Sequence, residues 1–118
     1  MTDLIEVQTS DLAGAALDWA VAQVEGIEVA IAEPHYGTGW RVYRPESGGK
    51  YSPSTDWAVA GPLLDKYHVS LIYAFEEYEA LIGMTGSGYH SSATAAVCRA
   101  IVAAKLGNTV QVPKELTQ

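Results

Sequence analysis

Alanine and larger apolar residues recur every three or four positions in two stretches of the chain, a period that predicts amphipathic helices. The first predicted helix spans residues 11–25 and ends at Gly26, with an apolar face of Ala13, Ala16, Leu17, Ala20 and Val24. The second spans residues 93–107, with an apolar face of Val97, Ala100, Ile101 and Ala104. Because alanine side chains are small, both helices can approach a neighbour closely.

Strands are predicted where β-branched and aromatic residues cluster or alternate with other residues, over 27–32, 40–44, 68–74 and 78–83. The last two strands are expected to form a hairpin through a tight turn at FEE (75–77), and a helix over 75–82 is the alternative. Near the C-terminus, TVQV can pair with IEVQ near the N-terminus.

The middle of the chain predicts a shorter helical insertion. Pro62 suits the first position of a helix, where no backbone N–H is needed, so a helix over 62–67 is expected after a helical turn at 55–60. The glycine-rich stretch MTGSGYHSS (84–92) predicts a mobile loop. Together these elements predict a single α+β domain over residues 1–118, with two longer helices on one face of a small, mostly antiparallel sheet.

Length and composition agree with a globular domain. The chain has 118 residues, of which 48% are hydrophobic and 18% are charged, which is typical of a folded protein with its own core. No apolar run approaches the roughly 20 residues that span a bilayer. The N-terminus MTDLIEVQTS lacks the basic and apolar segments of a signal peptide. We therefore expect a soluble cytoplasmic protein with no membrane contact.

The formal net charge of −7 bears on the class of partner. Binding to a phosphate backbone needs clustered lysine and arginine, whereas the seven basic residues here are scattered, so no direct nucleic-acid binding is expected. An acidic surface keeps a protein in solution and can also meet a basic partner.

Few residues point to a metal or a cofactor. The single cysteine, Cys98, excludes an internal disulfide and is expected to be a small core residue. The three histidines, His35, His68 and His90, are far apart and lack metal-ligand spacing, so no metal site is expected. GMTGSG (83–88) lacks both phosphate-binding glycine patterns, so no cofactor is expected.

The segment YSPSTDW (51–57) has two interpretations. As a helix start, Ser54 or Thr55 caps the first turn, Asp56 favours its positive end and Trp57 packs at the edge of the core. As a recognition site, Tyr51, Ser54, Asp56 and Trp57 line a pocket. A hydrolase built on Ser54 and Asp56 also needs a histidine base, which the sequence does not place.

Three blocks in this order, TSDLAGAALDWAVA, YSPSTDWAVAGPLL and CRAIVAAKLGNTVQVPKEL, resemble the NinX-like family of small bacteriophage and prophage proteins. The chain departs from the family where G-P-T-P usually precedes the last helix, since it has HSSA at 90–93, and it has Ala60 where the family has the first glycine of G-G-P. The resemblance implies a phage-encoded or prophage-derived accessory protein without an established activity. The family pattern carries over to Asp18, Trp19, Tyr51, Ser52, Pro53, Ser54, Thr55, Asp56, Trp57, Gly61, Pro62 and Arg99.

A hypothesis about a binding site follows from the resemblance. The segment 51–57 is expected to dock on the Asp18–Trp19 side of the first helix, with Arg99 paired to Asp18 or to Asp56. The candidate binding residues are Tyr51, Ser54, Thr55, Asp56, Trp57, Asp18, Trp19 and Arg99.

Three functions stay open at this point. The first is a protein-interaction module that acts on a host or phage protein, favoured by an exposed Trp57 on a flat surface. The second is a small-ligand-binding protein or hydrolase-like enzyme with a pocket near residues 51–57, favoured by a histidine against Asp56. The third is a structural homodimer, suggested by the alanine-rich helices.

Overall fold

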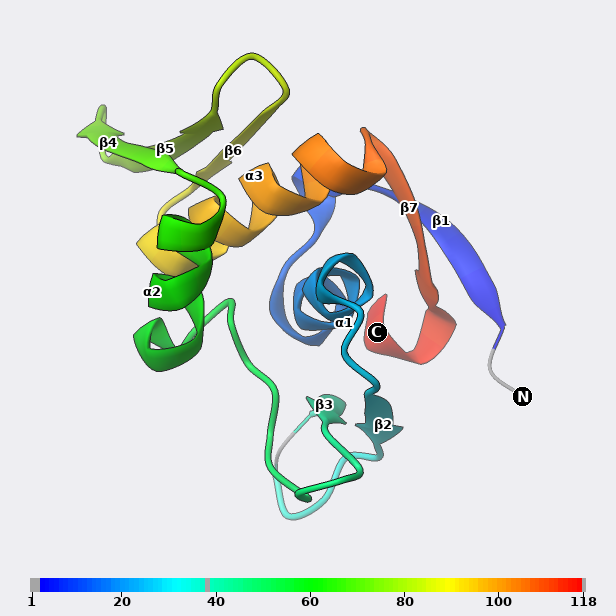
Figure 1. Ribbon diagram of the computed structural model, residues 1–118. Coiled ribbons are helices and arrows are strands. Elements are labelled where there is room, and N and C mark those ends of the chain that lie inside the picture. Colours follow the sequence, from blue (N-terminus) through cyan, green and yellow to red (C-terminus); the bar gives the residue numbers. More distant parts are fainter. Residues whose placement is uncertain (1–2, 38, 118) are drawn as a thin grey trace.

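The computed structural model describes residues 3–37 and 39–117 and shows an α+β fold, as the sequence predicts (Figure 1). The elements in chain order are β1 (Leu4–Gln8), the 3-10 turn η1 (Thr9–Asp11), α1 (Gly14–Glu25), β2 (Ala30–Ala32), β3 (Arg41–Tyr43), α2 (Trp57–Lys66), β4 (Ser70–Ala74), β5 (Glu77–Ile82), β6 (Gly86–His90), α3 (Ala93–Leu106), β7 (Thr109–Pro113) and the 3-10 turn η2 (Lys114–Thr117). None of the described helices has the length and apolar content that crossing a membrane requires.

The two alanine-rich helices α1 and α3 form the centre of the core. α1 buries Leu17, Ala20 and Val21 completely, and α3 buries Val97, Ala100 and Ile101 completely. Both helices end at a glycine with positive φ, Gly26 (67°) and Gly107 (94°), as predicted. α1 begins after Ala13 and not at residue 11 as predicted, since residues 9–11 form η1, where Thr9 Oγ1 donates to the carbonyl of Gly107 at 2.6 Å.

The described strands form three separate antiparallel sheets, β1–β7, β2–β3 and β4–β5–β6, where a single sheet was expected. The pairing of IEVQ with TVQV is confirmed, with Val7 opposite Val110 in the β1–β7 register. The hairpin between β4 and β5 is also confirmed, so the alternative helix over 75–82 is wrong. The turn of this hairpin has positive φ at two non-glycine residues, Phe75 (55°) and Glu76 (64°).

The predicted mobile loop at 84–92 is wrong, because most of it is the strand β6, which pairs with β5 and lies on α3. Two glycines allow this close approach. A Cβ on Gly88 would lie 2.4 Å from the carbonyl oxygen of Ala96, and a Cβ on Gly86 would lie 2.5 Å from that of Ala100. Glycine is needed here because the strand contacts the helix backbone closely. A glycine-rich sequence is equally typical of a loop, so glycine content alone did not distinguish the two.

The short helix is longer than predicted and begins earlier. α2 is one helix from Trp57 to Lys66 with Asp56 as its N-cap, and Pro62 lies inside it. The proposal that Pro62 opens the helix is therefore wrong. In Figure 1, α2 lies beside α3 and below the β4–β5–β6 sheet.

Candidate functional site

The first four residues of YSPSTDW are a buried bridge between the two central helices. Tyr51, Ser52, Pro53 and Ser54 are all buried. The backbone N–H of Ser54 donates to Oδ1 of Asp18 at 2.8 Å, and Thr94 Oγ1 donates to the carbonyl of Ser54 at 2.6 Å. One residue is thus held by α1 through its N–H and by α3 through its C=O, so the segment docks on the Asp18 side of α1 as hypothesised.

The carboxyl group of Asp18 is buried without an ion-pair partner among the described residues. Burial raises its pKa from 3.8 to about 6, and the hydrogen bond from the Ser54 N–H opposes part of that rise. The Ser54 hydroxyl lies near enough to lower the pKa as well, although Ser54 Oγ makes no hydrogen bond of acceptable geometry to any described residue. Asp18 therefore serves as a structural acceptor for the bridge.

The chemistry of a hydrolase is not assembled at this position. Ser54 is 2% exposed, so its hydroxyl cannot meet a substrate in this conformation. Its neighbouring acid is Asp18, whereas Asp56 lies on the surface and accepts from the N–H of Ala58 at 2.9 Å. Four well-formed hollows in the described part of the chain are lined by neither Ser54 nor Asp56, and no histidine lines them.

Burial also keeps two other groups near Asp18 in their protonated form, the Tyr51 phenol and the Cys98 thiol. Burial raises the pKa of the Tyr51 phenol and of the Cys98 thiol, and the nearby Asp18 charge adds to both shifts. Cys98 is fully buried in α3, so it is the small core residue that the sequence predicts.

The last three residues of the motif are exposed, in contrast to the first four. Thr55, Asp56 and Trp57 lie at the N-terminus of α2, and the Trp57 side chain is 49% exposed. The Asp56 carboxylate caps the helix, so a helix start at this segment is confirmed, but the predicted cap at Ser54 or Thr55 is wrong. The expected packing of Trp57 at the edge of the core is also wrong, since Trp57 is exposed. Trp19 of α1, the other candidate aromatic residue, is half-buried and packs against the core.

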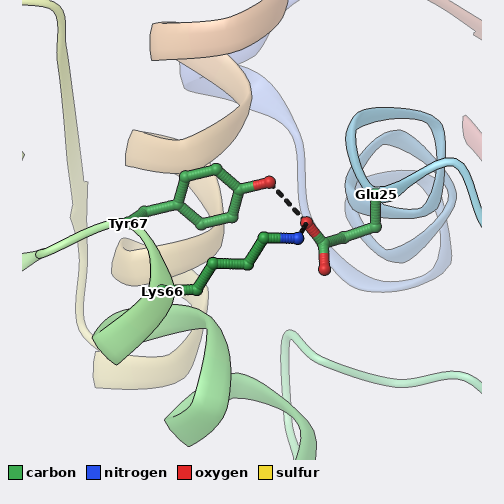
Figure 2. Close-up of polar contacts among 3 residues, drawn as sticks. All are labelled: Glu25, Lys66 and Tyr67. Carbon is green, nitrogen blue, oxygen red and sulfur yellow. Dashed lines mark hydrogen bonds and ion pairs between the residues drawn. The ribbon is translucent and has the colours of Figure 1, made fainter.

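A polar cluster at the other end of α2 fixes the direction of this helix (Figure 2). Glu25 at the end of α1 accepts from Lys66 Nζ at 2.9 Å and from the Tyr67 hydroxyl. Burial and the hydrogen bond to Glu25 raise the pKa of Tyr67 to about 12. Lys66 and Lys105 each lie 5.4 Å from the centre of the Tyr67 ring, so cations of α2 and α3 meet at one aromatic residue.

Arg99 is not where the binding-site hypothesis placed it. Its Nε donates to the carbonyl of Leu12 at 2.7 Å, and its Nη1 donates to the carbonyl of Tyr89 at 2.7 Å. The acidic groups that act on its charge are Asp11 and Glu77, so the predicted pair with Asp18 or Asp56 is wrong. Arg99 instead lies in a hollow of about 510 Å³ between β6 and the end of β1.

The histidines stay on separate elements. The His35 ring contacts the Tyr36 ring at a tilt of 60° with centres 4.0 Å apart, His68 follows α2, and His90 ends β6. His90 Nδ1 accepts from the N–H of Ser92 at 2.9 Å, and burial lowers its pKa. Within residues 3–37 and 39–117, no three His, Cys, Asp or Glu side chains are grouped to hold a metal ion.

Two important residues were missed by sequence reasoning. Thr94, which closes the bridge from α3, and Glu25, which accepts from Lys66 and Tyr67, are not among the candidate residues that the sequence indicates. The signal for both is weak, since hydrogen bonds that span 40 or 41 positions leave no local pattern.

A family model described as Bacteriophage P22, NinX matches residues 8–105 of the chain. The match includes α1, the 51–57 segment and nearly all of α3, which are the parts that form the bridge. A search of curated proteins finds none that matches.

Proposed function

We propose that this protein, which belongs to the bacteriophage P22 NinX family, is a phage- or prophage-derived accessory protein that works by binding another polypeptide of the host or the phage. The contact surface that we assign is the exposed side of the start of α2, formed by Thr55, Asp56, Trp57, Ala58 and Pro62. We call it the α2 surface. The observation that carries the proposal is the half-exposed Trp57 on a rigidly held helix start.

The physical argument rests on the cost of exposing tryptophan and on rigidity. Tryptophan is enriched among the residues that dominate binding energy, and Trp57 leaves apolar area in water at the start of a helix that also exposes Ala58 and Pro62. The bridge at Ser54 holds one end of α2, and the Glu25–Lys66–Tyr67 cluster holds the other. A surface held in this way loses little conformational entropy when it binds, which favours affinity.

The two alternative functions have less support. Ser54 is buried, and Asp56 is occupied as a helix cap, which argues against a hydrolase near residues 51–57. The alanine-rich faces of α1 and α3 are buried within one chain, and Gly88 of β6 packs against α3 at Ala96 and Ala100. The alanine content that suggested a homodimer therefore has an intramolecular explanation.

The test is a capture experiment with a matched control. Tagged wild type, Trp57→Ala and Phe75→Ala are incubated with bacterial lysate made with and without phage infection, and captured proteins are quantified by mass spectrometry. Phe75 is a suitable control because it is fully exposed on a different element. We expect a protein captured by wild type and by Phe75→Ala to be reduced at least tenfold with Trp57→Ala, and equal capture by all three contradicts the assignment.

A purified candidate partner then separates the roles of the charge and the ring. Asp56→Asn keeps an oxygen that can cap α2 and removes only the carboxylate charge. Binding that survives Asp56→Asn but not Trp57→Ala shows that the ring is the anchor, whereas the reverse result moves the contact to the acidic group.

A further inference from the structure

An open groove runs along one edge of the three-stranded sheet. Its larger part, of about 510 Å³, lies between β6 and the segment Gln8–Ser10, and its smaller part, of about 340 Å³, continues to the turn before β6. The two parts share Ser87, Ala103 and Asn108. We call the whole feature the β6 groove. Its elongated course along a strand suits an extended occupant better than a compact one.

Within the described part of the chain, the strand that lines this groove has backbone groups that pair with no other strand. β6 pairs with β5 on one side only, since the sheet order is β4–β5–β6. The turn hydrogen bond from Thr85 N–H to the Ile82 carbonyl sets the alternation of the hairpin, so Ser87 and Tyr89 direct their N–H and C=O groups away from β5. The Tyr89 carbonyl points in this direction and is occupied, because it accepts from Arg99, which lines the groove. The groups left for an added strand are the N–H and C=O of Ser87 and the N–H of Tyr89.

The opposite wall and the floor of the groove belong to other elements. The wall is formed by the end of β1 and the start of β7, where Thr9 N–H is already bonded to the Asn108 carbonyl. Ala103 of α3 lines the floor with a small side chain. An inserted strand would therefore find hydrogen-bonding groups on the β6 side and a small apolar residue beneath it.

The charges around the groove indicate the chemistry of the occupant. Arg99 is the basic residue that lines it, and two of its N–H groups are held by the carbonyls of Leu12 and Tyr89. Glu77 lines the groove, Asp11 acts on the same guanidinium, and Glu79 accepts from the Tyr89 hydroxyl at the outer face. Glu77 and Arg99 are thus the charged residues that line the groove, while Asp11 and Glu79 lie beside it, and the three carboxylates around one arginine complement lysine or arginine.

We propose that the β6 groove binds an extended, basic segment of a partner polypeptide, which adds to β6 as a fourth strand. Its side chains alternate, so small residues face Ala103 and basic residues reach Glu77 beside Tyr89. The proposal goes beyond the function assigned to the α2 surface, and it uses none of the residues of that surface.

The first test uses a designed probe. The acetylated, amidated heptapeptide Thr-Ala-Arg-Ala-Arg-Ala-Thr is titrated to millimolar concentration into the full-length 15N-labelled protein, and amide shifts are followed by NMR. We expect saturable shifts at Ser87, Tyr89 and Asn108, with those of Ala58 and Trp57 unchanged. Shifts that do not saturate, or that centre on α2, overturn the proposal.

The hydrogen-bonding pattern is tested by N-methylation of the same peptide. An added strand presents alternate N–H groups to β6, so methylation of one alternating set must weaken binding at least tenfold while methylation of the other set is tolerated. Equal effects of the two sets, whether both bind or both fail, contradict strand addition. This test needs no change in the protein.

Matched variants locate the edge and the charge. Ser87→Pro removes an N–H that faces the groove. Tyr73→Pro is the matched control, because it removes an outward-facing N–H from β4, at the opposite free edge of the same sheet. With folding checked by circular dichroism, we expect Ser87→Pro to weaken the peptide at least tenfold and Tyr73→Pro to leave it unchanged. Glu77→Gln is expected to weaken it about twofold to fivefold at low salt.

Light scattering separates the remaining occupant. The proposal is wrong if three results occur together: the wild-type chain dimerises, Ser87→Pro abolishes the dimer, and the peptide does not displace the second copy. The second copy is then the occupant of the groove. Loss of lysate capture by Trp57→Ala with unchanged peptide binding shows that the two sites are independent.

Discussion

Both sides of α3 are covered through small residues, but the elements that cover them expose very different surfaces. On one side, α1 and the segment 51–54 cover α3 with alanines and with a buried, hydrogen-bonded bridge at Ser54. On the other side, β6 covers α3 through Gly86 and Gly88, but the outer face of its sheet stays open. Five large hydrophobic residues are exposed on this sheet and its two turns: Ile72, Tyr73, Phe75, Met84 and Tyr89.

The difference shows where this small domain places stability and where it keeps surface for contact. The α1 side buries polar groups and satisfies most of them, which specifies one arrangement of helices at a cost in desolvation. The sheet side keeps a free edge, a turn in left-handed conformation and exposed aromatic residues. Binding surfaces have these properties more often than core elements do.

The largest expected effect comes from closing the gap between the sheet and α3. Gly88→Ala places a Cβ 2.4 Å from the Ala96 carbonyl oxygen and 2.6 Å from the Ala100 nitrogen, so the strand or the helix must move. We expect a loss of about 3 kcal/mol or more in the free energy of unfolding, measured by urea denaturation. Gly61→Ala in α2 is the control, since its Cβ would meet nothing within 4 Å. This substitution should raise the free energy of unfolding by about 0.5–1 kcal/mol.

The buried carboxyl on the α1 side predicts a pH dependence with a definite sign. The pKa of Asp18 is about 6 in the folded chain and 3.8 in the unfolded chain. Between these pH values the folded state therefore binds more protons than the unfolded state does. Stability from this group is therefore fully present below about pH 4 and lost as pH rises to about 6, by about 3 kcal/mol in total. Urea denaturation from pH 4 to pH 7 should show a decline relative to Asp18→Asn.

Two outcomes sharpen this prediction. Asp18→Asn keeps an oxygen that can accept from Ser54 N–H, whereas Asp18→Ala leaves that buried N–H without an acceptor. We expect Asp18→Ala to be about 1–3 kcal/mol less stable than Asp18→Asn at every pH. Identical pH profiles for wild type and Asp18→Asn would show that Asp18 keeps an ordinary pKa.

The strained hairpin on the sheet side predicts a gain in stability. Phe75 and Glu76 both have positive φ, which asparagine and glycine adopt at lower cost. The double substitution Phe75→Asn/Glu76→Gly should raise the free energy of unfolding by about 1–2 kcal/mol in total. A loss of stability would mean that Phe75 makes contacts that its full exposure does not indicate.

The smallest effect is expected at the cluster that orients α2. Glu25→Gln removes the ion pair with Lys66, whose side chain is 58% exposed, and keeps an oxygen for the Tyr67 hydroxyl. We expect a loss below about 1 kcal/mol that disappears at high salt, measured by thermal unfolding at two ionic strengths. A larger, salt-independent loss would place the stabilisation in the Tyr67 hydrogen bond.

Periodicity alone predicted the elements that have local signals. The helical spacing around Leu17 and Ile101 identified α1 and α3, and the β-branched runs identified the β4–β5 hairpin. The place of Asp56 at the positive end of α2 was also readable, although the expected cap was Ser54 or Thr55 and the Asp56 carboxylate makes it. The missed strand β6 carries glycines whose role depends on a helix backbone that follows later in the chain.

The candidate site divides in the same way. The sequence by itself determined that YSPSTDW begins a helical turn with an acid at its positive end, because these interactions are local, although it assigned the cap to Ser54 or Thr55. Only the tertiary structure decided that Asp18 and Thr94 hold the segment, that Arg99 lies beside β6 and that Trp57 faces water. Those facts depend on contacts between residues 10 to 87 positions apart, and a one-dimensional pattern does not encode which distant groups meet in the core.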